Sequence, residues 1–159
     1  MARVTLAREW VVRGAYGLDA AIERAARQQG LTVSRSAGGL ELRGGSQLKL
    51  RASGSLFARD DFLPRRGVVA HSALAGEHGA ERVTLLLEDT LGFGVMDRFL
   101  RRKYERVLAD AASAVEAALN ACAPEVRTAS AGAPSAPAAP DAPPAPDDDG
   151  SATILPKEP

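Results

Sequence analysis

The chain has 159 residues, and its 20 lysine and arginine residues are balanced by 20 aspartate and glutamate residues. This length predicts one modest domain with an additional segment, and the neutral total argues against a surface that attracts polyanions everywhere. Hydrophobic residues form 45% of the chain, yet no apolar run approaches the roughly 18 residues that a membrane-spanning helix requires. The N-terminus lacks the apolar stretch of a secretory signal, and the single cysteine, Cys122, can form no internal disulfide. We therefore expect a soluble, cytoplasmic protein, and the excess of arginine over lysine is typical of a GC-rich bacterial genome.

The composition changes at Pro124, because nine of the ten prolines lie in residues 124–159. That segment has too few large apolar residues to offset the entropy of ordering, so we predict an α+β domain over residues 1–123 and a disordered Pro/Ala/Asp-rich tail over 124–159. The domain has a net charge of +4 and the tail of −4. The tail is either a solvated linker or a screen for a basic face of its own domain. Its apolar cluster, residues 153–156, is either a docking peptide or a frayed terminus.

Apolar and polar residues alternate over residues 4–12, which predicts a half-buried strand. Apolar residues then recur at helical spacing over residues 18–29, and Gly30 is placed to end that helix. Further period-two patterns, separated by glycine-bearing turns, predict strands over residues 31–36, 40–43, 47–57, 68–74 and 82–89. In the strand over 68–74 we expect Val68, Ala70 and Leu74 to face inward, which places His71 on the outer face.

Nothing interrupts a helix over residues 95–123. Its apolar residues share one stripe, with Cys122 at the edge: Met96, Leu100, Val107, Ala111, Ala114, Val115 and Ala118. At 1.5 Å per residue this helix would be about 42 Å long, longer than any strand, so it must lie across the sheet. The order of strand, helix, five strands and long helix predicts an α+β fold with an antiparallel sheet of about six strands and helices on one face.

This order of elements is similar to that of helix-grip domains, the START and polyketide-cyclase-like group. The resemblance covers residues 2–123 and rests on element order. It implies a curved sheet wrapped around the C-terminal helix, with a cavity between them.

We predict no catalytic residue, no metal site and no cofactor. His71 and His78 are seven residues apart and belong to no zinc-ligand pattern. Ser46 and Lys49 have the spacing of an S-x-x-K motif, but the expected strand would point them to opposite faces. Residues 92–94 match the first half of a dinucleotide-binding fingerprint, but the third glycine is missing, so we interpret them as a tight turn from strand to helix.

Arg98, Arg102 and Arg106 form a row at four-residue spacing in the first half of the long helix. Like charges repel at this spacing, and cations near a helix N-terminus oppose the helix dipole. The row is therefore either a surface for an anion or an acidic partner, or a plain solvated face. Few aromatic residues accompany it and no nucleic-acid-binding motif is present, so nucleic acid is not the expected partner.

Arg8 interrupts the apolar face of the first strand, between Leu6 and Trp10. A lone buried guanidinium is costly. Either the strand bulges or ends and Arg8 reaches solvent, or Arg8 projects into a polar cavity that binds an acidic ligand. In the second case Arg8 and Trp10 are ligand-binding residues.

We favour a non-catalytic binding or interaction module whose partner the sequence does not identify. The alternative implied by the helix-grip resemblance is a carrier or small enzyme that holds a small apolar ligand between sheet and C-terminal helix. A third interpretation is a surface adaptor that uses the arginine row and the tail to meet an acidic protein. A filled space between sheet and helix would favour the adaptor, and a sizeable cavity the ligand binder.

Overall fold

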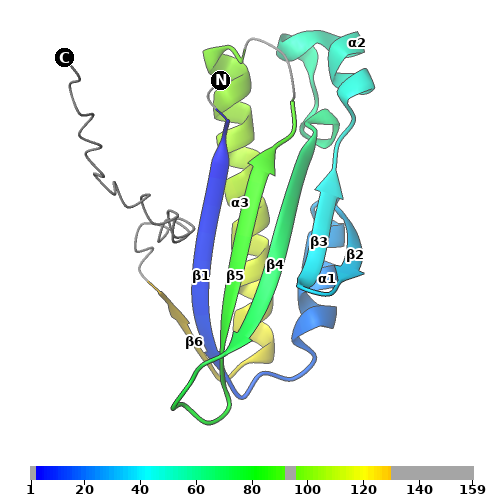
Figure 1. Cartoon of the computed structure of the whole chain (residues 1–159). Helices are drawn as coiled ribbons and strands as arrows, with labels where there is room; N and C mark the ends of the chain where they lie inside the picture. Colours follow the sequence, from blue (N-terminus) through cyan, green and yellow to red (C-terminus); the bar gives the residue numbers. More distant parts are fainter. Residues whose placement is uncertain (1–2, 92–95, 130–159) are drawn as a thin grey trace, which may run out of the picture.

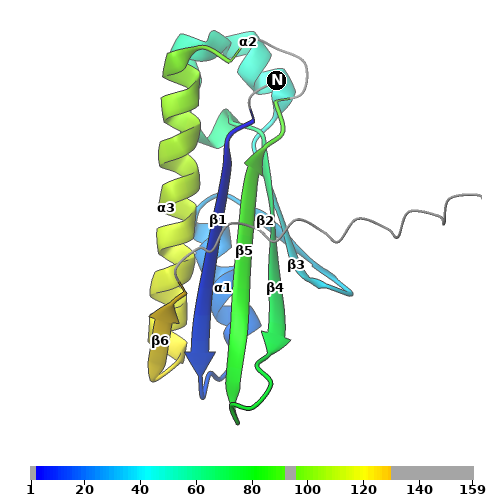
Figure 2. The same ribbon diagram turned by 60° about the vertical axis from the view of Figure 1, so that its left-hand side comes forward.

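A six-stranded antiparallel sheet forms one layer of the molecule, and two helices cover one of its faces (Figures 1 and 2). The computed structural model describes residues 3–91 and 96–129. Its elements in chain order are β1 (Thr5–Arg13), α1 (Leu18–Gln28), β2 (Thr32–Ser36), β3 (Gly39–Gly44), α2 (Gln47–Phe57), the 3-10 helix η1 (Asp60–Phe62), β4 (Arg65–Ala73), β5 (Ala80–Asp89), α3 (Arg98–Cys122) and β6 (Glu125–Thr128). The strand order is β2-β3-β4-β5-β1-β6. The α+β class, the antiparallel six-stranded sheet and the long helix packed on it are confirmed.

Strands β1 and β5 form the centre of the inner face. The even-numbered residues of β1 face the helices, as predicted, and Trp10 and Val12 are buried. Trp10 lies opposite Val83 in the antiparallel register, and the next inward residue of β5, Leu85, is also fully buried. Alternation alone identified this face because each strand has one apolar and one polar side.

Strand β4 presents the opposite face from the one we predicted. Val69 is fully buried, whereas Val68 is 41% exposed, and His71 lies on the helix-covered side. Valine occurs at both 68 and 69, so the pattern did not distinguish the two registers, and a shift of one residue exchanges the faces. Gly67 is consistent with this outcome, because a Cβ there would lie 2.4 Å from Leu87 Cδ2 and 2.9 Å from the Leu86 carbonyl oxygen, so this position faces a crowded core.

Residues 47–57 form helix α2 and not the strand that we predicted. Gly45, at φ +75°, turns the chain out of β3, and a Cβ on it would lie 2.0 Å from the Leu63 carbonyl oxygen. Ser46 then caps the helix, because its side chain accepts a hydrogen bond from the Lys49 amide. The helix is kinked at Gly54. The turn at Gly45 and the Ser46 cap favour a helix more strongly than the alternating leucines favour a strand. In this helix Leu50 is buried and Leu48 is 79% exposed.

Helix α3 runs along the length of the sheet (Figure 2). It begins at Asp97, whose Oδ1 accepts hydrogen bonds from the amides of Phe99 and Leu100 at 2.8 and 2.7 Å. The predicted apolar stripe is buried at Leu100, Val107, Ala111 and Val115, and four further residues of α3 are buried with it: Tyr104, Leu108, Ala112 and Leu119.

After α3 the chain adds strand β6, which pairs with β1 from Trp10↔Thr128 to Arg13↔Glu125. We had assigned these residues to the tail, so the sheet continues past the expected boundary at residue 123. The rest of that tail, residues 130–159, lies outside the described residues.

Candidate interaction surface at one end of the molecule

Buried side chains lie between the sheet and α3. Trp10, Tyr104 and Leu108 have no exposed surface. The Tyr104 hydroxyl donates a hydrogen bond to the Pro64 carbonyl at 3.2 Å, and burial, followed by the nearby Asp89, raises the pKa of Tyr104 well above its usual range. Trp10, which we considered as a ligand contact, is therefore a core residue in this structure.

Arg8 lies at the surface on the same side of β1 as Trp10. Its Nη1 donates to the Ala7 carbonyl at 3.2 Å, and the side chain is exposed. The strand neither bulges nor ends there, because the pairing with β5 runs without interruption through Arg8↔Leu85. Arg8 reaches solvent because β6 covers the flank of β1 only as far as Trp10.

Basic residues gather where α2, η1 and the start of α3 meet. Lys103 Nζ donates to the Ala58 carbonyl at 2.8 Å, and Arg106 donates to both carboxylate oxygens of Asp60 at 2.9 Å, which joins the two segments. Residues 47–62 and 97–106 contain eight basic side chains and four acidic ones. Their net charge of +4 equals that of all described residues together, so the rest of the described domain is neutral on balance.

The same end exposes large apolar side chains. Phe57 is 81% exposed, Leu48 is 79% exposed and Phe99 is 50% exposed. Phe57 precedes Ala58, whose carbonyl binds Lys103, and Phe99 lies one helical turn before Lys103 on the same row of α3. The two phenyl groups therefore belong to one surface.

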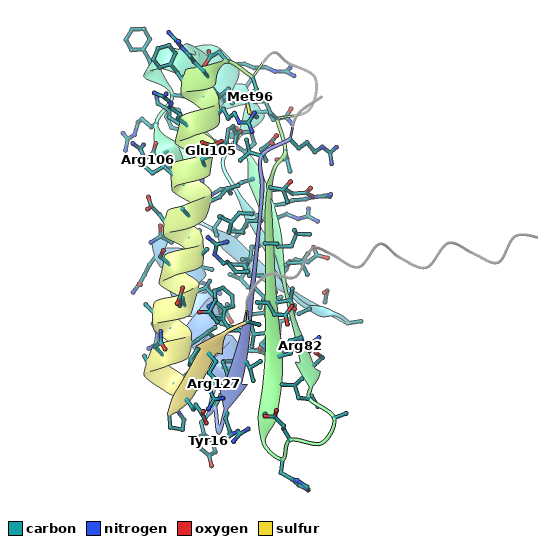
Figure 3. All side chains as sticks on the ribbon, turned by 90° about the vertical axis from the view of Figure 1, so that its left-hand side faces the viewer. Tyr16, Arg82, Met96, Glu105, Arg106 and Arg127 are labelled. Carbon is teal, nitrogen blue, oxygen red and sulfur yellow. The ribbon has the colours of Figure 1, made fainter. Side chains whose placement is uncertain are left out.

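We call this surface the basic aromatic end, and Figure 3 shows α2 at the end of the molecule where α3 begins. Its exposed members are Leu48, Lys49, Arg51, Phe57, Arg59, Arg98, Phe99 and Arg102. The Arg98 guanidinium lies 5.2 Å from the centre of the Phe99 ring. Lys49 and Arg59 lie 5.7 and 5.9 Å from the centre of the Phe62 ring. These three cations therefore lie close enough to the aromatic rings for cation–π contacts.

The predicted arginine row is exposed on α3, but its members differ in what they contact. Arg106 projects from α3 away from the sheet (Figure 3) and is paired with Asp60, and Arg98 stacks on Phe99. Arg102 has no ion-pair partner among the residues that the structure describes. Two members of the row, Arg98 and Arg102, thus remain available to a partner.

The sequence patterns did not predict the apolar members of this surface. We had placed Leu48 and Phe57 in a strand, and Phe99 lies beside the helical stripe rather than in it. The sequence contains two indications of this surface. Phe99 directly follows Arg98, and Ser46 is placed to cap a helix over residues 47–57.

A hollow of about 650 Å³ lies beside this end, and its polar lining includes Arg59, Asp61, Arg65 and Asp110. Arg65 is only 4% exposed, and burial lowers the pKa of its guanidinium. Its Nη atoms donate to the carbonyls of Gln29, Asp60 and Leu63 at 2.7, 2.9 and 3.2 Å. Arg65 therefore connects the end of α1 to η1, and we assign it a structural role.

The other residues considered in the sequence have ordinary environments. His71 Nε2 is 3.1 Å from Asp19 Oδ1, and His78 is exposed in the turn between β4 and β5. Cys122 is half-buried, and burial raises the pKa of its thiol. Within residues 3–91 and 96–129, no three His, Cys, Asp or Glu residues are grouped to hold a metal ion, and no helix is both long and apolar enough to cross a membrane. Residues 92–94 lie outside the described ranges.

No protein family model, no curated protein and no solved structure matches this chain. The helix-grip resemblance therefore rests on element order alone. The observed order departs from the expected one at α2, which stands in place of a strand, and at β6, which follows the last helix.

Proposed function

We propose that this protein is an interaction module whose basic aromatic end binds an acidic segment of another protein, one that also carries a large apolar residue. The observation that carries the proposal is the coincidence of the net charge of +4 with the exposed side chains of Leu48, Phe57 and Phe99. The burial of Trp10, Tyr104 and Leu108 between sheet and helix favours a surface function over the carrier alternative.

Exposed phenyl groups distinguish this end from an ordinary solvated face. Clusters of exposed apolar side chains rimmed by polar residues mark interaction sites, and aromatic residues and arginine are enriched at protein interfaces. Phe57 and Phe99 supply the rings, and Arg98 and Arg102 lie beside Phe99 on α3. A small surface of this kind is suited to a weak, reversible contact.

The mixed charge of the surface favours a protein partner over a polyanion. Three carboxylates lie among the cations and form ion pairs: Asp60 with Arg106, Asp61 with Arg59, and Glu105 with Arg101. These carboxylates weaken the attraction of the surface for a uniformly charged nucleic acid or anionic bilayer, whereas a peptide can place its acidic residues next to the cations and away from the carboxylates.

Fluorescence anisotropy with three labelled peptides tests the proposal. One carries Asp and Glu with an isoleucine and a leucine, the second has serine in place of both apolar residues, and the third has lysine in place of the acids. We expect saturable binding of the first, weaker binding of the second and none of the third. The affinity for the first should fall as salt is raised.

Variants locate the contact. Phe57→Ala should weaken binding of the first peptide about tenfold, as for the loss of a moderate anchor. Arg98→Gln with Arg102→Gln should weaken it about threefold or more at low salt and little at high salt. Tyr16→Ala is a matched control, because Tyr16 is 86% exposed and lies at the opposite end of the molecule (Figure 3). Arg24→Gln with Arg35→Gln makes the same charge change elsewhere.

Equal binding of all three peptides, or equal losses in the control variants, would contradict the proposal. Binding to anionic lipid vesicles or to single-stranded nucleic acid without binding to the acidic peptide would replace the protein partner by a membrane or a nucleic acid.

A further inference from the structure

We infer that the C-terminal segment of the same chain, residues 130–159, occupies the basic aromatic end in cis and competes there with the partner. The inference rests on the proposed function, because it assigns the same surface a second, intramolecular occupant. Three observations support it: the direction in which the chain leaves β6, the length of chain that follows, and the match of charge and apolar residues.

The direction comes from the pairing of β6 with β1. Thr128 lies opposite Trp10, and the Ala129 amide donates to the Glu9 carbonyl at 2.9 Å. Because the strands are antiparallel, the chain leaves β6 toward the Thr5 end of β1. Thr5 pairs with Glu88 near the end of β5, after which the chain enters α3. Figures 1 and 2 show α2 and the start of α3 at this end.

The length of the segment is sufficient. From the level of Trp10 to that of Thr5 the sheet extends about 17 Å, at 3.4 Å per residue. The 17 residues 130–146 contain six of the prolines, and an extended proline-rich chain of that length spans about 50 Å at 3.1 Å per residue. The acidic residues 147–149 can therefore reach α3 and α2 with slack.

The chemistry of the segment complements the surface. Residues 130–159 contain five acidic side chains and one basic one, a net charge of −4 against the +4 of the basic aromatic end. Ile154 and Leu155 are its only large apolar residues and follow the acidic run by five and six positions. If the acidic run binds Arg98 and Arg102, Ile154 and Leu155 would lie against Phe57 and Leu48. The segment thus has the composition that we propose for the partner.

Tethering makes even a weak contact effective. A linker that spans two sites gives an effective concentration of order 1 mM. A segment that would bind as a separate peptide with a Kd of about 0.2 mM would then occupy the surface about five-sixths of the time. It would weaken the apparent affinity of a competing peptide about sixfold.

Competition in the full chain tests the inference. The probe is a labelled synthetic peptide of residues 141–159, and the proteins are the unchanged chain and a tail variant with Asp147→Asn, Asp148→Asn, Asp149→Asn, Ile154→Ser and Leu155→Ser. We expect the tail variant to bind the probe at least threefold more tightly than the unchanged chain. The difference should disappear when Arg98→Gln and Arg102→Gln are added to both proteins.

A spin label gives a second measurement in the full chain. With Ser151→Cys in a Cys122→Ser background, the labelled segment should broaden the amide signals of Phe57 and Phe99 and leave that of Tyr16 unchanged. Equal probe affinity in both proteins, or uniform broadening, would overturn the inference. If the acidic peptide of the proposed function still binds, only the intramolecular contact is refuted. If neither peptide binds either protein, the proposed function fails with it.

Discussion

The inner face of the sheet and the basic aromatic end place similar side chains in opposite environments. Leu108 and Tyr104 are completely buried between α3 and the sheet, whereas Leu48 and Phe57 on α2 are about four-fifths exposed. Burial of a leucine or an aromatic side chain stabilises a fold by about 1.5 to 3 kcal/mol. The exposed pair forgoes that contribution. The difference indicates that the inner face maintains the fold and that the exposed side chains of the end contribute little to it, as expected of the binding surface that we propose.

Two buried polar residues mark the border between these regions. Arg65 connects α1 with η1 through three carbonyls, and Asp89 accepts hydrogen bonds from the amides of Val4 and Leu91. Buried hydrogen bonds of this kind hold neighbouring segments in one arrangement. They thereby fix the base from which α2 and the start of α3 project.

The sharpest test of the comparison replaces one leucine in each region. Leu108→Ala should lower the free energy of unfolding by about 2 to 5 kcal/mol, because it leaves a cavity in a filled core. Leu48→Ala should change it by less than about 0.5 kcal/mol, because the side chain is already in water. Urea unfolding measures both. Similar losses in the two variants would show that α2 is as much a part of the core as α3.

The second test removes the connection at the border. Arg65→Met should lower the free energy of unfolding by about 2 to 4 kcal/mol, because one buried and two partly buried carbonyls lose a charged donor. Its neighbour is the control: Arg66→Met removes an exposed ion pair with Glu88, whose loss should cost at most about 1 kcal/mol. If Arg65→Met were as stable as the unchanged chain, the contacts of Arg65 between α1 and η1 would not stabilise the fold. The burial of Arg65 beside the hollow would then need another explanation.

The third test concerns where the folded domain ends. A chain ending at Ala129 keeps β6, whose Val126 packs against the core, whereas a chain ending at Ala123 loses that strand and uncovers the edge of β1. The shorter chain should unfold at a temperature lower by about 4 to 10 °C, corresponding to about 1 to 2 kcal/mol in a domain of this size. Thermal unfolding by circular dichroism compares them. Equal midpoints would place the boundary at residue 123.

Most of the fold followed from the periodicity of the sequence. The patterns at β1, α1, β5 and α3 are long and one-sided, so the apolar face was defined without tertiary information. The pattern was ambiguous at β4, where valine occupies both faces, and at α2, where a glycine turn and a serine cap outweigh alternating leucines. Strand β6 was missed because its four residues lie in a segment of proline-rich composition, and its partner, β1, is more than a hundred residues away.

The candidate surface was only half predictable. Helical spacing placed Arg98, Arg102 and Arg106 on an exposed row, and the structure shows them exposed. The pairing of Arg106 with Asp60 depends on how η1 folds back on α3. The exposure of Phe57 depends on α2 lying at the end of the sheet rather than within it. Such relationships arise from tertiary packing and leave no local pattern.

The smallest expected effect belongs to the cap that begins α3 at the basic aromatic end. Asp97 bonds the amides of Phe99 and Leu100, and the first turn contains cations and no acid, so the cap is its main stabilising feature. Asp97→Ala should lower the free energy of unfolding by about 1 kcal/mol. It should also speed hydrogen exchange at those two amides and, by fraying the turn that carries Arg98, weaken binding of the acidic peptide. Asp97→Ser separates capping from charge, because serine can accept the same hydrogen bonds. A serine variant that binds and exchanges like the unchanged chain would confirm the cap, whereas one that behaves like the alanine variant would show that the carboxylate charge is what orders this end.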